Sequence, residues 1–169
     1  MRVILHDLSI EEKGAYLADQ LRDTDEIIER KEKDPLPCMG CFGCWVKTPG
    51  TCVIKDGYEN TGAYLGNAEE YIIISKCSYG EFSPFVKKVI DRGISYCHPY
   101  FVKRSGECHH KMRYSNSLKI KVIFYGDNLT NEDIECMEAR SKAMAINLGT
   151  TNITTEYLKS FEGGIRLCK

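Results

Sequence analysis

The sequence predicts an α/β protein, a three-layer sandwich around a five-stranded parallel sheet of strand order 2-1-3-4-5. Short apolar runs alternate with amphipathic helical patterns along the 169 residues, and this alternation is typical of parallel strands joined by right-handed crossovers. The run Tyr-Ile-Ile-Ile-Ser from Tyr71 to Ser75 contains no charge, as expected for a strand buried on both faces of a sheet. We expect residues 1–169 to form a single domain.

The other expected strands are short apolar runs between turn signals. The chain opens with Arg-Val-Ile-Leu-His, and a weaker run carries Ile27 and Ile28. The later runs are Lys-Ile-Lys-Val-Ile-Phe-Tyr and a segment rich in threonine. In chain order, the expected strands cover residues 2–6, 26–29, 71–75, 119–125 and 152–158.

Capping residues mark where the helices begin. Ser9 with Glu12, and Thr130 with Asp133, have the spacing of a capping box, in which each side chain bonds the backbone N–H of the other residue. A serine followed by a proline at residues 83–84 is a further start signal. The expected helices cover residues 10–21 and 58–65, and two more begin at residues 83 and 130.

Two long segments fall outside this pattern. Residues 34–57 form an irregular loop that holds a cluster of cysteines, and residues 94–118 are aperiodic, polar and aromatic. A loop as long as the second usually serves as a lid, an interface or a binding loop. Ligands of such sheets bind outside the carboxyl ends of the strands, where residues 7–10, 76–83 and 126–131 are expected to meet.

The composition excludes several classes of protein. The formal net charge is −1, so the chain lacks the basic surface that nucleic-acid binding requires. No apolar run is long enough for a membrane helix, and charge follows the first residues too closely for a signal peptide. We therefore expect a cytoplasmic protein. Among the charged residues, Arg92 is expected on the solvated face of its helix and Asp56 as a helix cap.

Four of the nine cysteines fall within fifteen residues, with the spacing C-x2-C-x2-C-x7-C. Two consecutive x2 spacings place three thiolates on one tight loop, which suits an iron–sulfur cluster with a fourth ligand nearby. Zinc sites more often contain two separated C-x2-C pairs. A 4Fe–4S cluster, a zinc ion and thiols without metal all remain open. The candidate ligands are Cys38, Cys41, Cys44 and Cys52.

Two segments carry a family resemblance. The first, Cys38-Met-Gly-Cys-Phe-Gly-Cys-Trp-Val-Lys-Thr-Pro-Gly-Thr-Cys-Val-Ile-Lys-Asp56, is similar to the cysteine segment of flavodoxin-like NAD(P)H-dependent FMN reductases and iron–sulfur flavoproteins. The second, Ser75-Lys-Cys-Ser-Tyr-Gly-Glu-Phe-Ser-Pro-Phe-Val-Lys-Lys-Val-Ile-Asp-Arg92, resembles the loop and helix of that family that adjoin the flavin. The resemblance covers residues 34–93 and extends more faintly over the whole chain.

The resemblance implies a flavodoxin-like fold, FMN as cofactor and NAD(P)H as electron donor. It also implies a homodimer that passes electrons to a small-molecule or protein acceptor, through the cysteine segment if this holds a cluster. In that family the loop after the third strand contacts the flavin ring. By position, the corresponding residues here are Cys77, Ser78, Tyr79, Gly80 and Glu81.

The first loop departs from the pattern of the family, which has a Gly-Ser-x-Arg loop to hold the FMN phosphate. Here the sequence is His-Asp-Leu-Ser-Ile-Glu-Glu, with Ser9 as the candidate phosphate donor and Asp7 as a repulsive charge. Three functions therefore stay open. The first is an FMN-dependent NAD(P)H oxidoreductase, and the alternatives are a flavin-free binding or partner subunit and an iron–sulfur electron-transfer protein. No catalytic residue is assigned.

Overall fold

The computed structural model describes residues 1–104, 106–159, 161 and 164–167. Its main sheet contains five parallel strands in the order β2-β1-β3-β7-β8, which is the predicted order 2-1-3-4-5. A two-residue strand, β4, pairs antiparallel with the end of β3. The strands are β1 (Arg2–His6), β2 (Glu26–Ile28), β3 (Glu70–Ser78), β4 (Glu81–Phe82), β7 (Lys119–Tyr125) and β8 (Ile153–Leu158).

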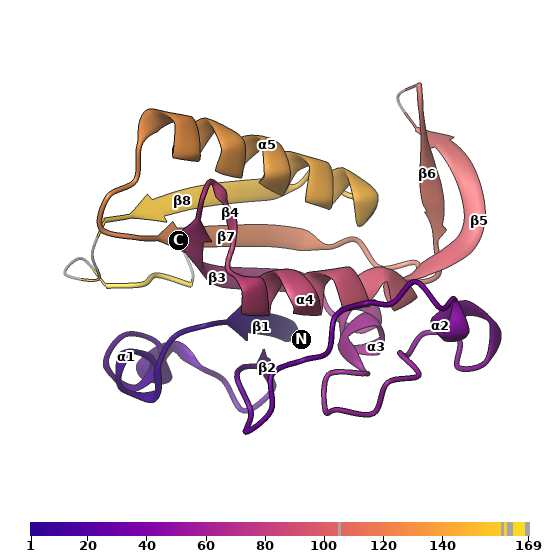
Figure 1. Cartoon of the computed structure of the whole chain (residues 1–169), viewed down its shortest axis with the longest axis horizontal. Helices are drawn as coiled ribbons and strands as arrows, with labels where there is room; N and C mark the ends of the chain where they lie inside the picture. The colour runs from indigo at the N-terminus through magenta and orange to yellow at the C-terminus, as the bar shows by residue number, and fades with distance from the viewer. Residues whose placement is uncertain (105, 160, 162–163, 168–169) are drawn as a thin grey trace.

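Helices cover both faces of this sheet. One core cluster joins Val3 and Ile73 of the strands to α3, α4 and α5, whereas Ile4 and Ile72 face the other way, toward Leu17 and the C-terminal segment. Figure 1 shows α4 and α5 side by side over the first face. The helices are α1 (Ile10–Tyr16), α2 (Gly43–Val46), α3 (Thr61–Gly66), α4 (Pro84–Arg92) and α5 (Asn131–Asn147), with 3-10 turns η1 (Ala18–Gln20) and η2 (Gly93–Tyr96).

Both predicted capping boxes are present, at the starts of α1 and α5. The first helix is shorter than predicted, because it ends at Tyr16 and is followed by the turn η1. The side chain of Gln20 hydrogen-bonds the backbone of Ile165 and Leu167, so this end of the helix is bound to the C-terminal segment. Sequence periodicity cannot detect a contact with so distant a segment.

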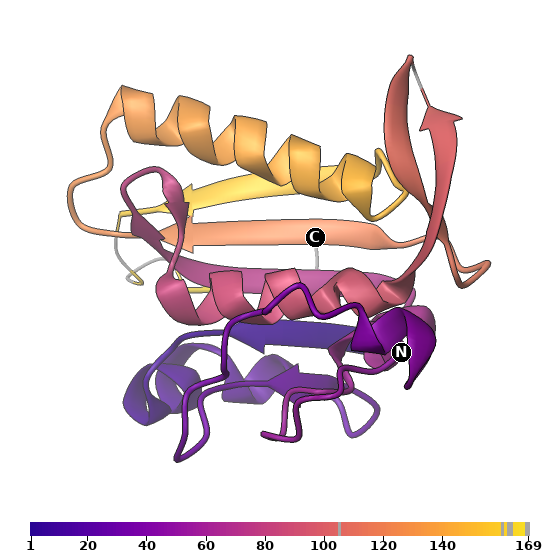
Figure 2. The same ribbon diagram turned by 45° about the vertical axis from the view of Figure 1, so that its right-hand side comes forward.

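The prediction that residues 94–118 form a long loop without regular structure was wrong. This stretch contains a β-hairpin of β5 (Cys97–Arg104) and β6 (Glu107–Met112), while residue 105 lies outside the described residues. Figures 1 and 2 show the hairpin projecting beyond the sheet. Its two faces both mix polar and aromatic side chains, so the sequence lacks the apolar alternation that marks a half-buried strand.

No helix within the described ranges combines the length and the apolar character needed to cross a membrane.

Candidate functional site

The carboxyl edge of the sheet is occupied by a cluster of the protein's own polar groups. Asp7 follows β1, and both of its carboxylate oxygens accept from the Lys76 N–H at 3.1 Å. The Tyr125 hydroxyl, at the end of β7, donates to Asp7 Oδ1 at 2.9 Å, and Ser83 also hydrogen-bonds this carboxylate. Burial raises the pKa of Asp7, while these three hydrogen bonds act in the opposite direction.

Ser9, the candidate phosphate donor, is engaged in the capping box. Its hydroxyl accepts from the Glu12 N–H at 3.1 Å, and its own N–H donates to Glu12 Oε2 at 2.8 Å. The helix that follows has only seven residues. The Ser9 N–H and hydroxyl therefore do not fit the role of phosphate donors, because the capping box already engages both groups.

The predicted flavin loop is a tight β-hairpin. Cys77 pairs with Phe82 and Ser78 pairs with Glu81, which leaves Tyr79 and Gly80 as the two turn residues. Both have positive φ values, 54° and 71°, as a type I′ turn requires. The Tyr79 side chain is 99% exposed. Of the five predicted residues, only Glu81 lines one of the pockets described below.

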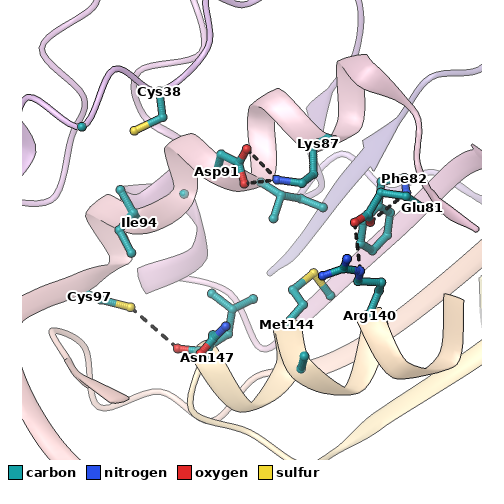
Figure 3. A pocket seen from close by; sticks show the side chains of 15 residues that line it. Cys38, Glu81, Phe82, Lys87, Asp91, Ile94, Cys97, Arg140, Met144 and Asn147 are labelled. Atoms are coloured by element: carbon teal, nitrogen blue, oxygen red, sulfur yellow. Dashed lines mark hydrogen bonds and ion pairs between the residues drawn. The ribbon is translucent and has the colours of Figure 1, made fainter. Parts of the chain in front are cut away.

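A groove of about 560 Å³ lies between α4 and α5. Its apolar lining includes Phe82, Ile90, Met144 and Leu148. Figure 3 shows that the groove runs along α4, from Glu81 and Phe82 at one end to Cys38 at the other. It therefore joins the predicted flavin loop to the cysteine loop.

The charges that line this groove are paired. Lys87 Nζ lies 2.6 and 2.7 Å from the two carboxylate oxygens of Asp91, one helical turn away. Arg140 Nε, on α5, lies 3.3 Å from Glu81 Oε2. The two cations and two carboxylates balance each other, so the groove carries no net charge.

The four predicted metal ligands line one smaller cavity. Cys38, Cys41, Cys44 and Cys52 are among the residues that line a cavity of about 110 Å³, and Cys38 lines the groove as well. Burial raises the pKa of Cys44, and electrostatic coupling to the three neighbouring cysteines raises it further. The structure thus brings together all four cysteines that the spacing singled out.

A buried arginine and a partly buried aspartate hold the cysteine loop in place, and the predictions for both residues were wrong, since Asn60 and not Asp56 caps α3. The Arg92 side chain is fully buried rather than solvated, and it donates to Asp56 and to the Ile54 carbonyl. Asp56 in turn accepts from the Leu36 N–H at 3.0 Å. Burial alone would raise the pKa of Asp56, but hydrogen bonds from Arg92 and the backbone hold it below its usual value.

The cysteine loop also packs against the projecting hairpin. The Trp45 indole N–H donates to the Cys97 carbonyl at 3.0 Å. The His110 ring lies between Trp45 and Phe101, with ring centroids 5.0 and 4.8 Å away. His110 therefore joins two elements by packing.

No group of three or more His, Cys, Asp or Glu side chains in the described part of the chain is arranged to hold a single metal ion. A 4Fe–4S cluster is larger than one ion, and its cysteine ligands surround a volume rather than converge on a point. The cysteine cavity contains four sulfur donors.

Comparisons place the fold in a known class. The strand order and crossovers define a flavodoxin-like fold, which confirms the prediction. No model of a known protein family matches the sequence, and no curated protein matches it.

Among solved structures, an FMN-dependent NADH-azoreductase from Bacillus anthracis, crystallised with FMN, is similar with a TM-score of 0.55 and 13% identity. The match covers 94% of this chain and 87% of that one. The NAD(P)H:quinone oxidoreductase from Methanothermobacter marburgensis gives a TM-score of 0.55 at 14% identity, covering 96% and 89% of the two chains. At these identities the likeness establishes a shared fold.

Proposed function

We propose that this chain is an NAD(P)H-dependent flavin oxidoreductase that binds the ring system of a flavin such as FMN in the groove between α4 and α5. The observation that carries this proposal is the position of the groove, between the predicted flavin loop and the cysteine cavity. Its volume of about 560 Å³ lies within the range of small-molecule sites. Two reductases of the same fold use FMN or NAD(P)H by name, which favours this class.

The groove offers what a flat, largely apolar ring needs. Phe82, Ile90 and Met144 provide apolar walls that exclude water from the faces of the ring. The paired charges at Arg140 and Glu81 supply polar contacts at one end. The chain would orient the flavin and tune its electrostatics, and the bound group would supply the hydride chemistry with NAD(P)H and the electron transfer to a small-molecule or protein acceptor.

A groove-filling substitution tests the proposal. Ala143 lines the groove at an exposed position of α5, so Ala143→Trp should fill it and weaken FMN binding by about tenfold or more. Ala139, one turn earlier, is exposed and does not line the groove, so Ala139→Trp is the matched control. Flavin fluorescence measures binding, and loss of flavin absorbance under anaerobic NADH or NADPH measures reduction.

Two results would contradict this function. If Ala143→Trp and Ala139→Trp bind FMN equally well, the flavin does not bind in the groove. If the wild-type chain binds no flavin, the flavin-free binding or partner subunit becomes the better assignment. The homodimer and the cytoplasmic location stay predictions.

A second candidate function is favoured by the cysteine cavity. We propose that Cys38, Cys41, Cys44 and Cys52 hold a 4Fe–4S cluster, because all four line one cavity and four cysteines are the donors that this cluster uses. Anaerobic purification followed by iron and sulfide analysis tests it. Cys44→Ser should lose the iron, whereas Cys136→Ser, an exposed cysteine on α5, should keep it. Equal iron contents in the two variants would exclude the cluster.

A further inference from the structure

We infer that this chain recognises a flavin through its ring system and not through its 5′-phosphate, so that riboflavin and FMN are equivalent ligands. The inference rests on the proposed function and deepens it by naming the substrate class, namely free flavins with or without a phosphate. A solved structure of similar fold binds FMN, whereas the polar groups at the carboxyl edge of this sheet do not suit a phosphate. The inference comes from this disagreement.

The first observation concerns backbone donors. A phosphate is usually held by several free N–H groups at the end of the first strand. Here the Lys76 N–H binds both carboxylate oxygens of Asp7 at 3.1 Å, and the Ser9 N–H binds Glu12 at 2.8 Å. The Asp7 N–H donates to the Ile74 carbonyl at 3.3 Å. These three donors are already engaged, and the Glu12 N–H, in the first turn of α1, binds the Ser9 hydroxyl at 3.1 Å.

The second observation concerns charge. Asp7 and Glu12 place two carboxylates beside the end of β1 and the start of α1, and like charges repel a phosphate dianion there. Against them stand the exposed Lys76 side chain and the guanidinium of Arg30, whose charge lowers the pKa of Asp7. Arg30 is already paired with Asp34 at 2.8 Å, and an exposed lysine contributes little binding energy. The edge therefore disfavours an anion both by its geometry and by its charge.

The groove between α4 and α5 offers no alternative site for the phosphate. Its two cations, Lys87 and Arg140, are each paired with a carboxylate. A phosphate that reached either one would have to displace Asp91 or Glu81. The apolar lining contacts the ring system, which is identical in riboflavin and FMN.

The experiment compares the two flavins on the full chain by quenching of flavin fluorescence, with inorganic phosphate as a competitor. We expect dissociation constants within about threefold of each other, and no change in either when millimolar phosphate is added. FMN binding about tenfold tighter than riboflavin, or competition by phosphate, overturns the inference and leaves the proposed function intact. Absence of binding for both flavins overturns both.

A charge-neutral variant tests the role of Asp7. Asp7→Asn keeps the shape of the side chain and removes its charge, so FMN binding should strengthen several-fold relative to riboflavin. The riboflavin constant should stay unchanged, and it also reports that the variant is folded. Glu69→Gln is the control, because Glu69 is exposed at the opposite end of β3. An unchanged ratio of the two constants in Asp7→Asn contradicts the role given to Asp7.

Discussion

The guanidinium of Arg92, at the last position of α4, donates a hydrogen bond to the carboxylate of Asp56, and this ion pair closes the cysteine loop onto the helix. The Arg92 side chain is fully buried and that of Asp56 is 12% exposed. Because Arg92 also bonds the Ile54 carbonyl, one side chain fixes the end of the loop that carries Cys52.

Removal of this arginine should be strongly destabilising. Arg92→Ala leaves the Asp56 charge poorly solvated, which should lower the free energy of unfolding by about 3 kcal/mol. Urea unfolding followed by circular dichroism measures the change. Lys88→Ala, which removes only a surface pair with Asp34 at 3.9 Å, should cost less than about 1 kcal/mol. Equal losses in the two variants would show that the buried pair contributes no more than a surface pair.

Stability should depend on pH through His6. Burial lowers the pKa of His6 to about 4, partly opposed by Glu29, whose Oε2 lies 3.4 Å away, while Lys13 lowers it further. An unfolded histidine titrates near 6.5, so the unfolded chain binds this proton first, and stability is lost as the pH falls from 6.5 toward 4.

Between pH 6.5 and 4, the titration of His6 should lower the free energy of unfolding by about 3 kcal/mol. Urea unfolding at a series of pH values measures the slope. His6→Gln should flatten the slope between pH 6.5 and 4, whatever its effect on absolute stability. A variant with the slope of the wild type would assign the pH dependence to other groups.

Two glycine substitutions should have opposite effects. A Cβ on Gly62 would lie 2.0 Å from Ser95 Oγ and 2.6 Å from the backbone N of Tyr96, so Gly62→Ala should cost about 2 kcal/mol or more. A Cβ on Gly14, in α1, has no neighbour within 4 Å. Gly14→Ala should therefore stabilise the chain by about 0.5 kcal/mol through helix propensity. Thermal unfolding checks both, and a stabilised Gly62→Ala would contradict the packing of α3 against η2.

The turn between β3 and β4 offers a stabilising substitution. Tyr79 has a φ of 54°, a left-handed conformation that asparagine tolerates better than tyrosine. Tyr79→Asn should stabilise the chain by about 0.5 kcal/mol, since the exposed ring has little packing to lose. The same variant asks whether Tyr79 contacts the flavin. If flavin binding is unchanged, Tyr79 does not contact the flavin. If the free energy of unfolding falls, the turn is not of type I′.

Local signals predicted most of the sheet and the helix starts. The apolar run at Tyr71–Ser75 lies within β3, and the Ser9 and Thr130 caps begin α1 and α5. Each of these depends on residues that are neighbours in the sequence. The spacing of the cysteines likewise predicted their gathering around one cavity, because three of them share one loop.

The missed features depend on contacts between distant segments. Arg92 was interpreted from its helix alone, whereas Asp56, its partner, lies 36 positions earlier. Asp7 was expected to repel a phosphate. Its carboxylate also accepts a hydrogen bond from the Lys76 N–H, 69 positions away, and this contact could not be predicted because it forms only in the folded sheet. The hairpin of β5 and β6 was missed because its strands are not half-buried in an apolar core.

Trp45 is the only tryptophan in the sequence, and it lines the cysteine cavity while its indole N–H binds the Cys97 carbonyl. The chain therefore carries an intrinsic optical probe at one of its two candidate redox positions. Excitation of this single indole would register metal uptake, thiol oxidation or a shift of the hairpin, without any attached label.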